Sequence, residues 1–189
     1  MKHLRCAETA PFVRKALAVA FPGIKFSVRS ETYSGGASIT VSWTDGPRTP
    51  EVEAITRRLE GADFDGMIDL KSYRSHWLTA DGRLTLAHIQ GSEGSGGCIP
   101  QERYPASSIS AAEEVHLGAD FIFCNRHISD PDAKQAEAET WIRTHCRTEG
   151  IPPHDVFGRD RVEWIARHIT WDRGVGESVE SAFNRRFHS

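Results

Sequence analysis

Paired cysteines and long apolar runs are both missing from this chain of 189 residues. Without Cys-x2-Cys spacing, neither a compact zinc motif nor a dense disulfide framework is expected, and free thiols in a reduced, cytoplasmic protein are predicted. No apolar run approaches the ~20 residues that span a bilayer, and the first residues carry charges where a signal peptide has an apolar core. We therefore expect no contact with a membrane. The four cysteines are Cys6, Cys98, Cys124 and Cys146.

A large excess of charge of one sign is also missing. The net charge is −3. Residues 1–75 hold 11 Lys and Arg against 9 Asp and Glu, which gives +2, and residues 76–189 hold 12 against 17, which gives −5. Sequence-independent binding of nucleic acid needs a concentrated basic surface, and mimicry of DNA needs a strongly acidic one. Charge alone therefore identifies no partner.

The motifs of well-known catalytic and cofactor sites are absent too. There is no Gly-x-Ser-x-Gly elbow, no His-Glu-x-x-His helix and no dinucleotide fingerprint. The glycine-rich run at residues 91–97 lacks the Gly-Lys-Ser/Thr ending of a phosphate-binding loop, and we interpret it as a surface loop. The nine histidines have no short paired spacing, which leaves open only a zinc site assembled from distant ligands. We predict no cofactor and no metal.

Three aspartates lie close together in residues 61–69: Asp63, Asp65 and Asp69. Carboxylate oxygens bind calcium and magnesium, which makes a cation site one interpretation of this segment. The glutamate at the twelfth position of a calcium loop is missing, however, and Asp and Gly are common in turns. We expect a structured loop here.

The most regular pattern in the chain is a predicted β-hairpin at residues 26–47. Phe26 and Val28 alternate with polar residues, and so do Ile39, Val41 and Trp43 beyond a glycine-bearing loop. Such period-two alternation indicates two strands with one buried and one solvent-facing side. The solvent-facing side carries hydroxyl groups and two cations and is suited to binding.

Helices are predicted on both sides of the hairpin, which gives an α-β-β-α order. The first begins near Thr9 and Pro11, and the second begins at Thr49, with Pro50 in its first turn. Further elements are predicted from apolar periodicity: a strand over 84–89, a central strand over 119–126 buried on both faces, and helices over 130–148, 159–172 and 177–187.

These elements predict an α+β fold. It consists of a small, mostly antiparallel sheet with the N-terminal α-β-β-α unit and a helical C-terminal third packed on it. We expect two lobes, residues 1–75 and 76–189, that share one core.

Several stretches of the N-terminal part resemble one family. They are Ala-Phe-Pro-Gly-Ile-Lys-Phe-Ser-Val-Arg-Ser at 20–30, Tyr-Ser-Gly-Gly at 33–36, Ser-Ile-Thr-Val-Ser-Trp-Thr-Asp-Gly-Pro at 38–47 and Gly-Ala-Asp-Phe-Asp-Gly-Met at 61–67. They closely resemble the large polyvalent protein-associated domain of type 29, and residues 118–127 look like a continuation. The resemblance implies a protein of a phage, plasmid or integrating conjugative element in a bacterial host, often beside anti-restriction or other establishment functions. It carries over no catalytic residues.

Two functional hypotheses rest on binding. The first is a non-enzymatic interaction protein with a counter-defence role, such as an anti-CRISPR or anti-restriction inhibitor that binds a host immune complex. The second is a nucleic-acid-binding accessory protein, in which cations and tyrosines form a stacking surface. A second aromatic stripe on the helix over 159–172 either packs internally or meets a partner. The candidate binding surface comprises Lys25, Arg29, Tyr33, Arg48, Arg57, Arg58, Lys71, Tyr73, Arg74, Trp164, His168 and Trp171.

The third hypothesis is an enzyme with an unfamiliar site near Cys124 and His127, with Asp120 and Arg126 as further members. Strand alternation opposes a Cys-His pair, because it places Cys124 and His127 on opposite faces. A bend after Asn125 is needed to bring them together. Gathering of these groups in one pocket favours this hypothesis, and their dispersal counts against it.

Overall fold

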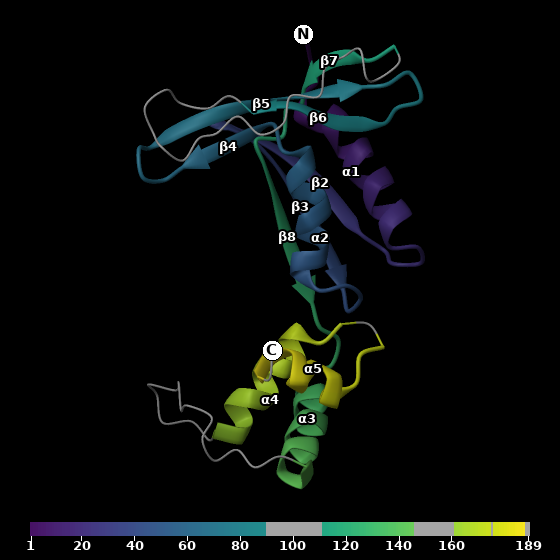
Figure 1. The fold of residues 1–189 in the computed structure, drawn as a ribbon, viewed down its shortest axis with the longest axis vertical. Coiled ribbons are helices and arrows are strands. Elements are labelled where there is room, and N and C mark those ends of the chain that lie inside the picture. Colours follow the sequence, from purple (N-terminus) through teal and green to yellow (C-terminus); the bar gives the residue numbers. More distant parts are fainter. Residues whose placement is uncertain (90–110, 146–160, 175, 188–189) are drawn as a thin grey trace. The chain divides into compact units, whose positions relative to one another are not determined.

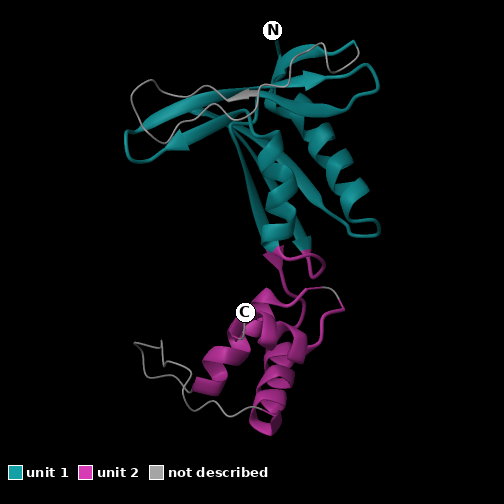
Figure 2. Cartoon of the chain, viewed as in Figure 1, with its two compact units in different colours: residues 1–43, 49–125 teal, residues 44–48, 126–189 magenta. Residues whose placement is uncertain are grey.

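The chain folds into two compact units, which have different colours in Figure 2. The computed structural model describes residues 1–89, 111–145, 161–174 and 176–187. Unit 1 consists of Met1–Trp43 and Thr49–Asn125, and unit 2 consists of Thr44–Arg48 and Arg126–Ser189. Each unit has its own cluster of buried apolar side chains.

The order of the elements confirms the predicted α+β class, with an α-β-β-α unit near the N-terminus and helices in the C-terminal part (Figure 1). None of the helices in the described ranges is long and apolar enough to cross a membrane. In chain order the elements are β1 (Lys2–His3), α1 (Cys6–Ala20), β2 (Ser27–Tyr33), β3 (Gly36–Thr44), α2 (Thr49–Thr56), the 3-10 helix η1 (Arg57–Leu59), β4 (Ala62–Asp65), β5 (Leu70–Leu78), β6 (Leu84–Ile89), β7 (Glu113–His116), β8 (Phe121–His127), α3 (Pro131–His145), α4 (Arg161–Asp172) and α5 (Val179–Phe187).

The division of the chain differs from the predicted one, which separated residues 1–75 from 76–189. Ser75 lies inside β5 and is buried, and the core of unit 1 takes side chains from both sides of it, such as Val41 and Val115. The two predicted lobes therefore share a core only as far as Asn125. Beyond that residue, buried side chains of α3, α4 and α5 form a separate cluster.

A three-stranded sheet in the order β2-β3-β8 contains the predicted hairpin, whose two strands are antiparallel. The third strand, β8, runs parallel to β3. At the start of both strands the Asp120 N–H donates to the Ala37 carbonyl, and at their ends the Asp45 N–H donates to the His127 carbonyl. The hairpin is thus extended by a strand that comes about 80 residues later in the chain.

β8 lies at the edge of this sheet, which corrects the prediction of a central strand buried on both faces. Ile122 is 5% exposed, whereas its neighbour Phe123 is 54% exposed. The buried side of the strand faces α2, where the Cys124 thiol lies 3.4 Å from the Thr56 hydroxyl. The apolar run predicted burial on both faces, but one of its phenylalanines stands in solvent.

Helices α1 and α2 form the core of unit 1 with the buried side of the three-stranded sheet. α1 begins at Cys6 rather than near Thr9, because the Glu8 carboxylate accepts the Arg5 backbone N–H at 2.7 Å and caps the first turn. Pro11 consequently lies inside the helix. α2 begins at Thr49, as predicted, and tightens into η1 before β4.

β5 is the centre of a second sheet and was not predicted from the sequence. Its first half pairs with β4, and its second half pairs with β6 on one edge and β7 on the other; β1 adds to β7 in parallel. Two buried positions of β5 are polar. The Ser75 hydroxyl donates to Glu114 at 2.7 Å, and His76 Nε2 lies 2.7 Å from the Arg58 carbonyl. The strand therefore lacks the apolar alternation by which β2 and β3 were recognised.

Unit 2 combines three helices with the turn at Thr44–Arg48. The predicted apolar stripes are confirmed, since Ile142 of α3, Ile165 and Ile169 of α4 and Phe183 of α5 are buried in one cluster. The predicted extensions of α3 to residue 148 and of α4 back to residue 159 lie outside the described residues.

Candidate functional site

A cleft opens in unit 1 where β4 separates from β8. The N–H groups of Gly61 and Ala62 donate to the carbonyls of Ala119 and Asp120, at 2.7 and 3.3 Å. Beyond this point β4 pairs with β5, while β8 continues along β3 (Figure 1). The cavity of about 420 Å³ between them is called the β4–β8 cleft. It is lined by Glu53, Arg57, Glu60, Asp63, Phe64, Arg74 and residues 121–125.

Glu60 and Arg74 are the least exposed charged side chains of the cleft, at 14% each. Glu60 Oε1 accepts the Ile122 N–H at 3.0 Å, while Oε2 lies 3.7 Å from Arg74 Nη1, which is too long for a charge-assisted hydrogen bond. Arg74 instead donates from Nη1 to the Arg57 carbonyl at 2.8 Å, and its Nη2 forms an ion pair with Asp63 Oδ2 at 3.1 Å. Burial raises the pKa of Glu60 above its ordinary value despite the nearby cation.

Two half-exposed aromatic side chains are among the residues that line the cleft. Phe64 of β4 is 52% exposed and Phe123 of β8 is 54% exposed. Cys124 follows Phe123 on β8 and contacts Thr56, and burial raises the pKa of its thiol. A thiol with a raised pKa stays protonated at neutral pH, so Cys124 lacks the activation of a catalytic nucleophile.

The turn between β4 and β5 extends the cleft with exposed apolar side chains. Met67 is 96% exposed, Ile68 47% and Leu70 37%. Residues 60–70 contain four acids and no Lys or Arg. Contiguous large apolar side chains in solvent, beside charge of one sign, are typical of a surface that binds another macromolecule. Residues 64–70 are called the β4–β5 tip.

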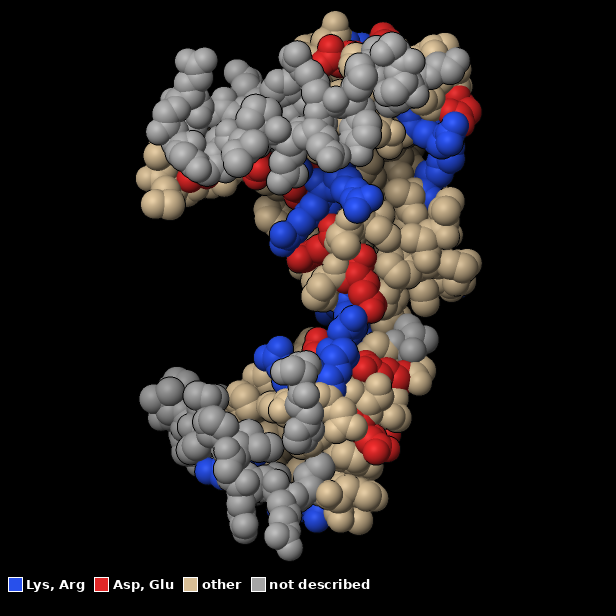
Figure 3. Space-filling view, in the orientation of Figure 1, with Lys and Arg blue, Asp and Glu red and all other residues tan. Residues whose placement is uncertain are grey.

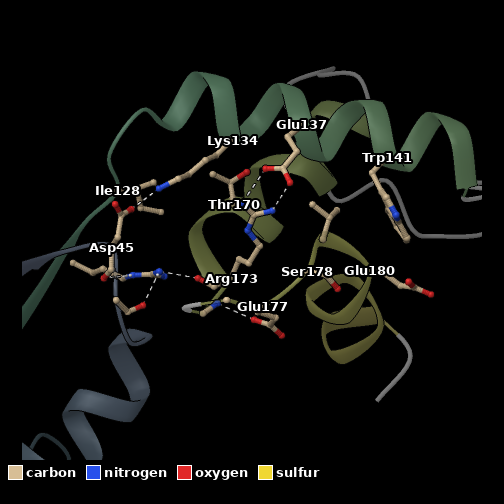
Figure 4. A pocket seen from close by; sticks show the side chains of 15 residues that line it. Asp45, Ile128, Lys134, Glu137, Trp141, Thr170, Arg173, Glu177, Ser178 and Glu180 are labelled. Carbon is tan, nitrogen blue, oxygen red and sulfur yellow. Dashed lines mark hydrogen bonds and ion pairs between the residues drawn. The ribbon is translucent and has the colours of Figure 1, made fainter. Parts of the chain in front are cut away.

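A second cavity, of about 590 Å³, lies within unit 2 (Figure 4). Arg126 joins its walls: Nη2 donates to the carbonyls of Gly46 and Arg173, at 3.1 and 2.7 Å, and Nη1 donates to that of Trp171 at 3.0 Å. Two of these carbonyls belong to the C-terminal end of α4, where backbone acceptors lack partners within the helix. Arg126 therefore caps α4 and fixes the Thr44–Arg48 turn against it.

Most of the other charged side chains of this cavity are paired with one another or with nearby residues. Arg173 donates to both oxygens of Glu137, at 3.1 and 2.9 Å, and Lys134 pairs with Asp45 (Figure 4). Hydrogen bonds from Arg185 lower the pKa of Glu177 to about 2. These closed ion pairs hold the three helices and the turn together, and we assign this cavity a structural role.

Acidic partners neutralise part of the predicted basic surface in unit 1. On the face that Figure 3 shows, basic and acidic side chains lie side by side. The observed pairs are Lys71 with Asp120, Arg57 with Glu53, and Arg74 with Glu60 and Asp63. The other predicted members are exposed on separate elements: Lys25 before β2, Arg29 and Tyr33 on β2, Arg58 on η1 and Tyr73 on β5. Their role in binding stays a prediction.

Four predicted members of the surface lie in unit 2. Trp164 and His168 are half-buried with ring centroids 4.0 Å apart, and Trp164 also packs 6.3 Å from Phe187. Internal packing therefore accounts for these two. Trp171 is 51% exposed, and Arg48 is half-buried in the turn.

The residues of the enzyme hypothesis are dispersed. β8 continues as a strand through His127, so Cys124 and His127 lie on opposite faces. Asp120 pairs with Lys71, and Arg126 belongs to the cavity of unit 2. The bend needed to assemble a Cys-His pair is not seen.

The acidic segment at residues 61–69 is a strand and a turn rather than a loop. Asp63 pairs with Arg74, and Asp65 accepts the Met67 N–H at 2.9 Å, so two of the three carboxylates have protein partners. Within the described ranges, no three metal-ligating side chains gather. The glycine-rich run at 91–97 lies outside those ranges.

Sequence reasoning missed the residues that shape the cleft, namely Glu60, Phe64 and Phe123. It also missed Met67 and Leu70 of the β4–β5 tip. One signal was available: residues 64–70 alternate between large apolar residues and acids in a segment expected to be exposed.

The chain belongs to the family described as large polyvalent protein associated domain 29, whose model matches residues 4–129. This confirms the resemblance read from the sequence. The matched segment covers nearly all of unit 1, including the β4–β8 cleft and the β4–β5 tip. Membership indicates a protein associated with mobile elements or phages. No curated protein and no solved structure matches the chain.

Proposed function

We propose that this mobile-element protein acts by binding a protein complex of its bacterial host, as a counter-defence inhibitor of the anti-CRISPR or anti-restriction kind, and not by catalysis. The observation that carries the proposal is the β4–β5 tip, where Phe64, Met67, Ile68 and Leu70 stand in solvent. A few large side chains that become buried supply most of the affinity of a protein–protein interface. These four can do so without rearrangement of the core.

The charge around the tip indicates the chemistry of the partner. Residues 60–70 carry four acids and no base, and this negative charge favours a partner with a basic surface. CRISPR effectors hold nucleic acid in positively charged channels, and other nucleic-acid enzymes use similar grooves. An acidic tip with an apolar centre complements such a groove and blocks it sterically.

Direct binding of nucleic acid is the competing function. Its support is weaker, because Lys71 and Arg74 already face carboxylates. Phosphate binding is most favourable for Lys and Arg side chains that do not first have to leave a carboxylate of their own protein, because release of counterions then drives the binding. If the protein binds nucleic acid directly, the exposed Arg29 and Tyr33 on β2 are the residues to mutate first.

The experiment is a pull-down with the tagged full-length chain from a bacterial host that carries active CRISPR and restriction systems, with and without nuclease. Captured proteins are identified by mass spectrometry, and the affinity for each purified defence subunit is then measured. The test variant carries Met67→Ser and Ile68→Ser, and the matched control is Val19→Ser, which changes an aliphatic side chain that is 77% exposed on α1.

The proposal predicts a defence-complex subunit that survives nuclease treatment, and an affinity at least tenfold lower for the tip variant than for the control. Recovery of nucleic acid alone, lost at high salt, contradicts it and favours the competing function. Equal binding by the tip variant and the control contradicts the assignment of the tip.

A further inference from the structure

The β4–β8 cleft has an excess of negative charge among its lining residues. Glu53, Glu60 and Asp63 contribute three acids against the two cations Arg57 and Arg74, which leaves −1. The cleft is next to the β4–β5 tip, which adds Asp65 and Asp69 without a base. A cation is therefore the ligand that the local charge favours.

One carboxylate oxygen in the cleft lacks a short cationic partner. Glu60 is 86% buried as a side chain, yet its Oε2 lies 3.7 Å from Arg74 Nη1, which donates one of its two protons to the Arg57 carbonyl. Buried polar atoms are usually hydrogen-bonded, and the strongest hydrogen bonds of a carboxylate come from charged donors at short distance. From the described residues Glu60 receives one hydrogen bond, from the Ile122 N–H on Oε1, so a donor that enters the cleft can approach Oε2.

The aromatic walls select the shape of that donor. Phe64 of β4 and Phe123 of β8 both line the cleft, and each leaves about half of the side chain in solvent. A planar guanidinium stacks on aromatic faces and offers several N–H donors in its plane, whereas the ammonium of lysine is a compact, strongly hydrated charge. A planar cation therefore uses both the rings and the carboxylate.

We propose that the β4–β8 cleft binds the guanidinium of an arginine side chain presented by the protein partner. The inference rests on the proposed function for the source of that arginine. Phe64 and Phe123 enclose the guanidinium, and Glu60 Oε2 accepts its N–H, while the aliphatic stem lies toward the exposed apolar side chains of the tip. The volume of about 420 Å³ is within the range of about 300–1,000 Å³ found for ligand pockets.

A nucleobase is the strongest competing ligand, since it also stacks on phenylalanine. A nucleotide brings its phosphate close to the three carboxylates of the cleft, where like charges repel. Arginine places its charge among the same groups with the opposite sign.

The test uses the full-length chain and needs no host protein. The probe is the peptide Gly-Gly-Arg-Gly-Gly, and its matched control contains citrulline, which has the shape of arginine without the charge. Both are titrated while backbone amide shifts are followed by NMR. We expect saturable shifts at Phe64, Ile122 and Phe123, and an affinity about tenfold lower for the citrulline peptide, the factor typical of a partly desolvated cation–π contact.

Two variants test the assigned groups. Phe123→Ala removes one aromatic side chain of the cleft. Glu60→Gln removes the negative charge but keeps an acceptor for the Ile122 N–H. Each variant should lower the affinity for the arginine peptide by about tenfold. Val19→Ala, which shortens an exposed apolar side chain on α1, should leave its affinity unchanged. Equal binding of the two peptides, shifts outside the cleft, or no shifts at millimolar peptide overturn the proposal. Tighter binding of thymidine monophosphate in the cleft overturns it as well.

The two proposals can fail separately. If the defence complex is captured equally by Phe123→Ala and Glu60→Gln but not by the tip variant, the arginine site is wrong and the proposed function stands. If the arginine peptide binds as expected but no host protein is captured, the proposed function fails and the guanidinium site remains.

Discussion

The ammonium nitrogen of Lys71 lies 2.8 Å from Oδ2 of Asp120, and the same oxygen accepts the Ala37 N–H at 3.0 Å. Lys71 belongs to the central strand of the larger sheet, and Asp120 immediately precedes the edge strand of the smaller one. The carboxylate is only 10% exposed. This single side chain therefore ties the two sheets of unit 1 together close to the point where the β4–β8 cleft begins.

Asp120→Ala should destabilise unit 1 by about 3 kcal/mol, because it leaves a half-buried ammonium and a buried backbone N–H without their acceptor. Urea unfolding followed by far-UV circular dichroism measures the change. Asp120→Asn keeps an acceptor for the Ala37 N–H and should lose about half as much. Equal stability of the wild type and Asp120→Ala contradicts a structural role for the pair.

Gly61→Ala should prevent stable folding of unit 1 or cost at least about 3 kcal/mol, because an added Cβ lies 1.9 Å from the backbone oxygen of Leu117. Backbone atoms cannot move aside without loss of the hydrogen bonds that hold β4 against β8. Gly35→Ala is the control, since its Cβ meets nothing within 4 Å. Thermal unfolding should show a large decrease for the first variant and little change for the second.

His76 should make unit 1 sensitive to mild acid. Its side chain is fully buried, Nε2 donates to the Arg58 carbonyl, and Nδ1 has no hydrogen-bond partner within the described residues. Burial lowers the pKa of His76 to about 4 from 6.5 in the unfolded chain. The unfolded state therefore binds the proton more readily, and stability falls as the pH decreases from 6.5 to 4, by about 3 kcal/mol.

Urea unfolding as a function of pH measures this loss. His76→Gln keeps a donor for the Arg58 carbonyl and has no titrating group, so its stability should change less between pH 6.5 and pH 4. Parallel pH profiles for the wild type and this variant are the result that contradicts the prediction.

Glu177 should titrate far below an ordinary glutamate. Hydrogen bonds from Arg185 lower its pKa to about 2, whereas in the unfolded chain the value is 4.5. A depressed pKa means that the carboxylate stabilises unit 2 above pH 4.5, and that this stabilisation is lost as the pH falls from 4.5 to 2. The carboxyl carbon shift in an NMR titration gives the pKa directly. In Arg185→Gln the midpoint should return toward 4.5; a midpoint near 4.5 in the wild type contradicts the ion pair.

Elements with a local signal were predictable from the sequence. The alternation around Val28 and Val41 identified the hairpin, and the apolar spacing of Ile165 and Ile169 identified α4. In each case the residues that define the element lie within a few positions of one another. The same reasoning missed β5, because Ser75 and His76 are buried against Glu114 and Arg58. Those partners come from other parts of the chain, and no sequence pattern within the strand predicts them.

The candidate site depended on the same kind of distant pairing. Lys71 and Arg74 were predicted to form a basic surface, which is a fair interpretation of cations beside tyrosines. Their partners Asp120 and Glu60 come from other elements, so the neutralised surface is visible only in the fold. The β4–β8 cleft likewise arises because Gly61 contacts Ala119 and the two strands then separate.

Unit 2 begins, in effect, before unit 1 is finished, because the Thr44–Arg48 turn is made long before the helices that it contacts. During synthesis the Gly46 carbonyl cannot accept its hydrogen bond until Arg126 has been made. Arg126 in turn cannot donate to the carbonyls of Trp171 and Arg173 until α4 has been made. A fragment that ends at residue 129, where the family match ends, keeps this guanidinium but lacks the carbonyls of Trp171 and Arg173. Truncation therefore removes part of the hydrogen bonding of Arg126 in the shorter piece, and single-residue changes are the cleaner way to separate the roles of the two units.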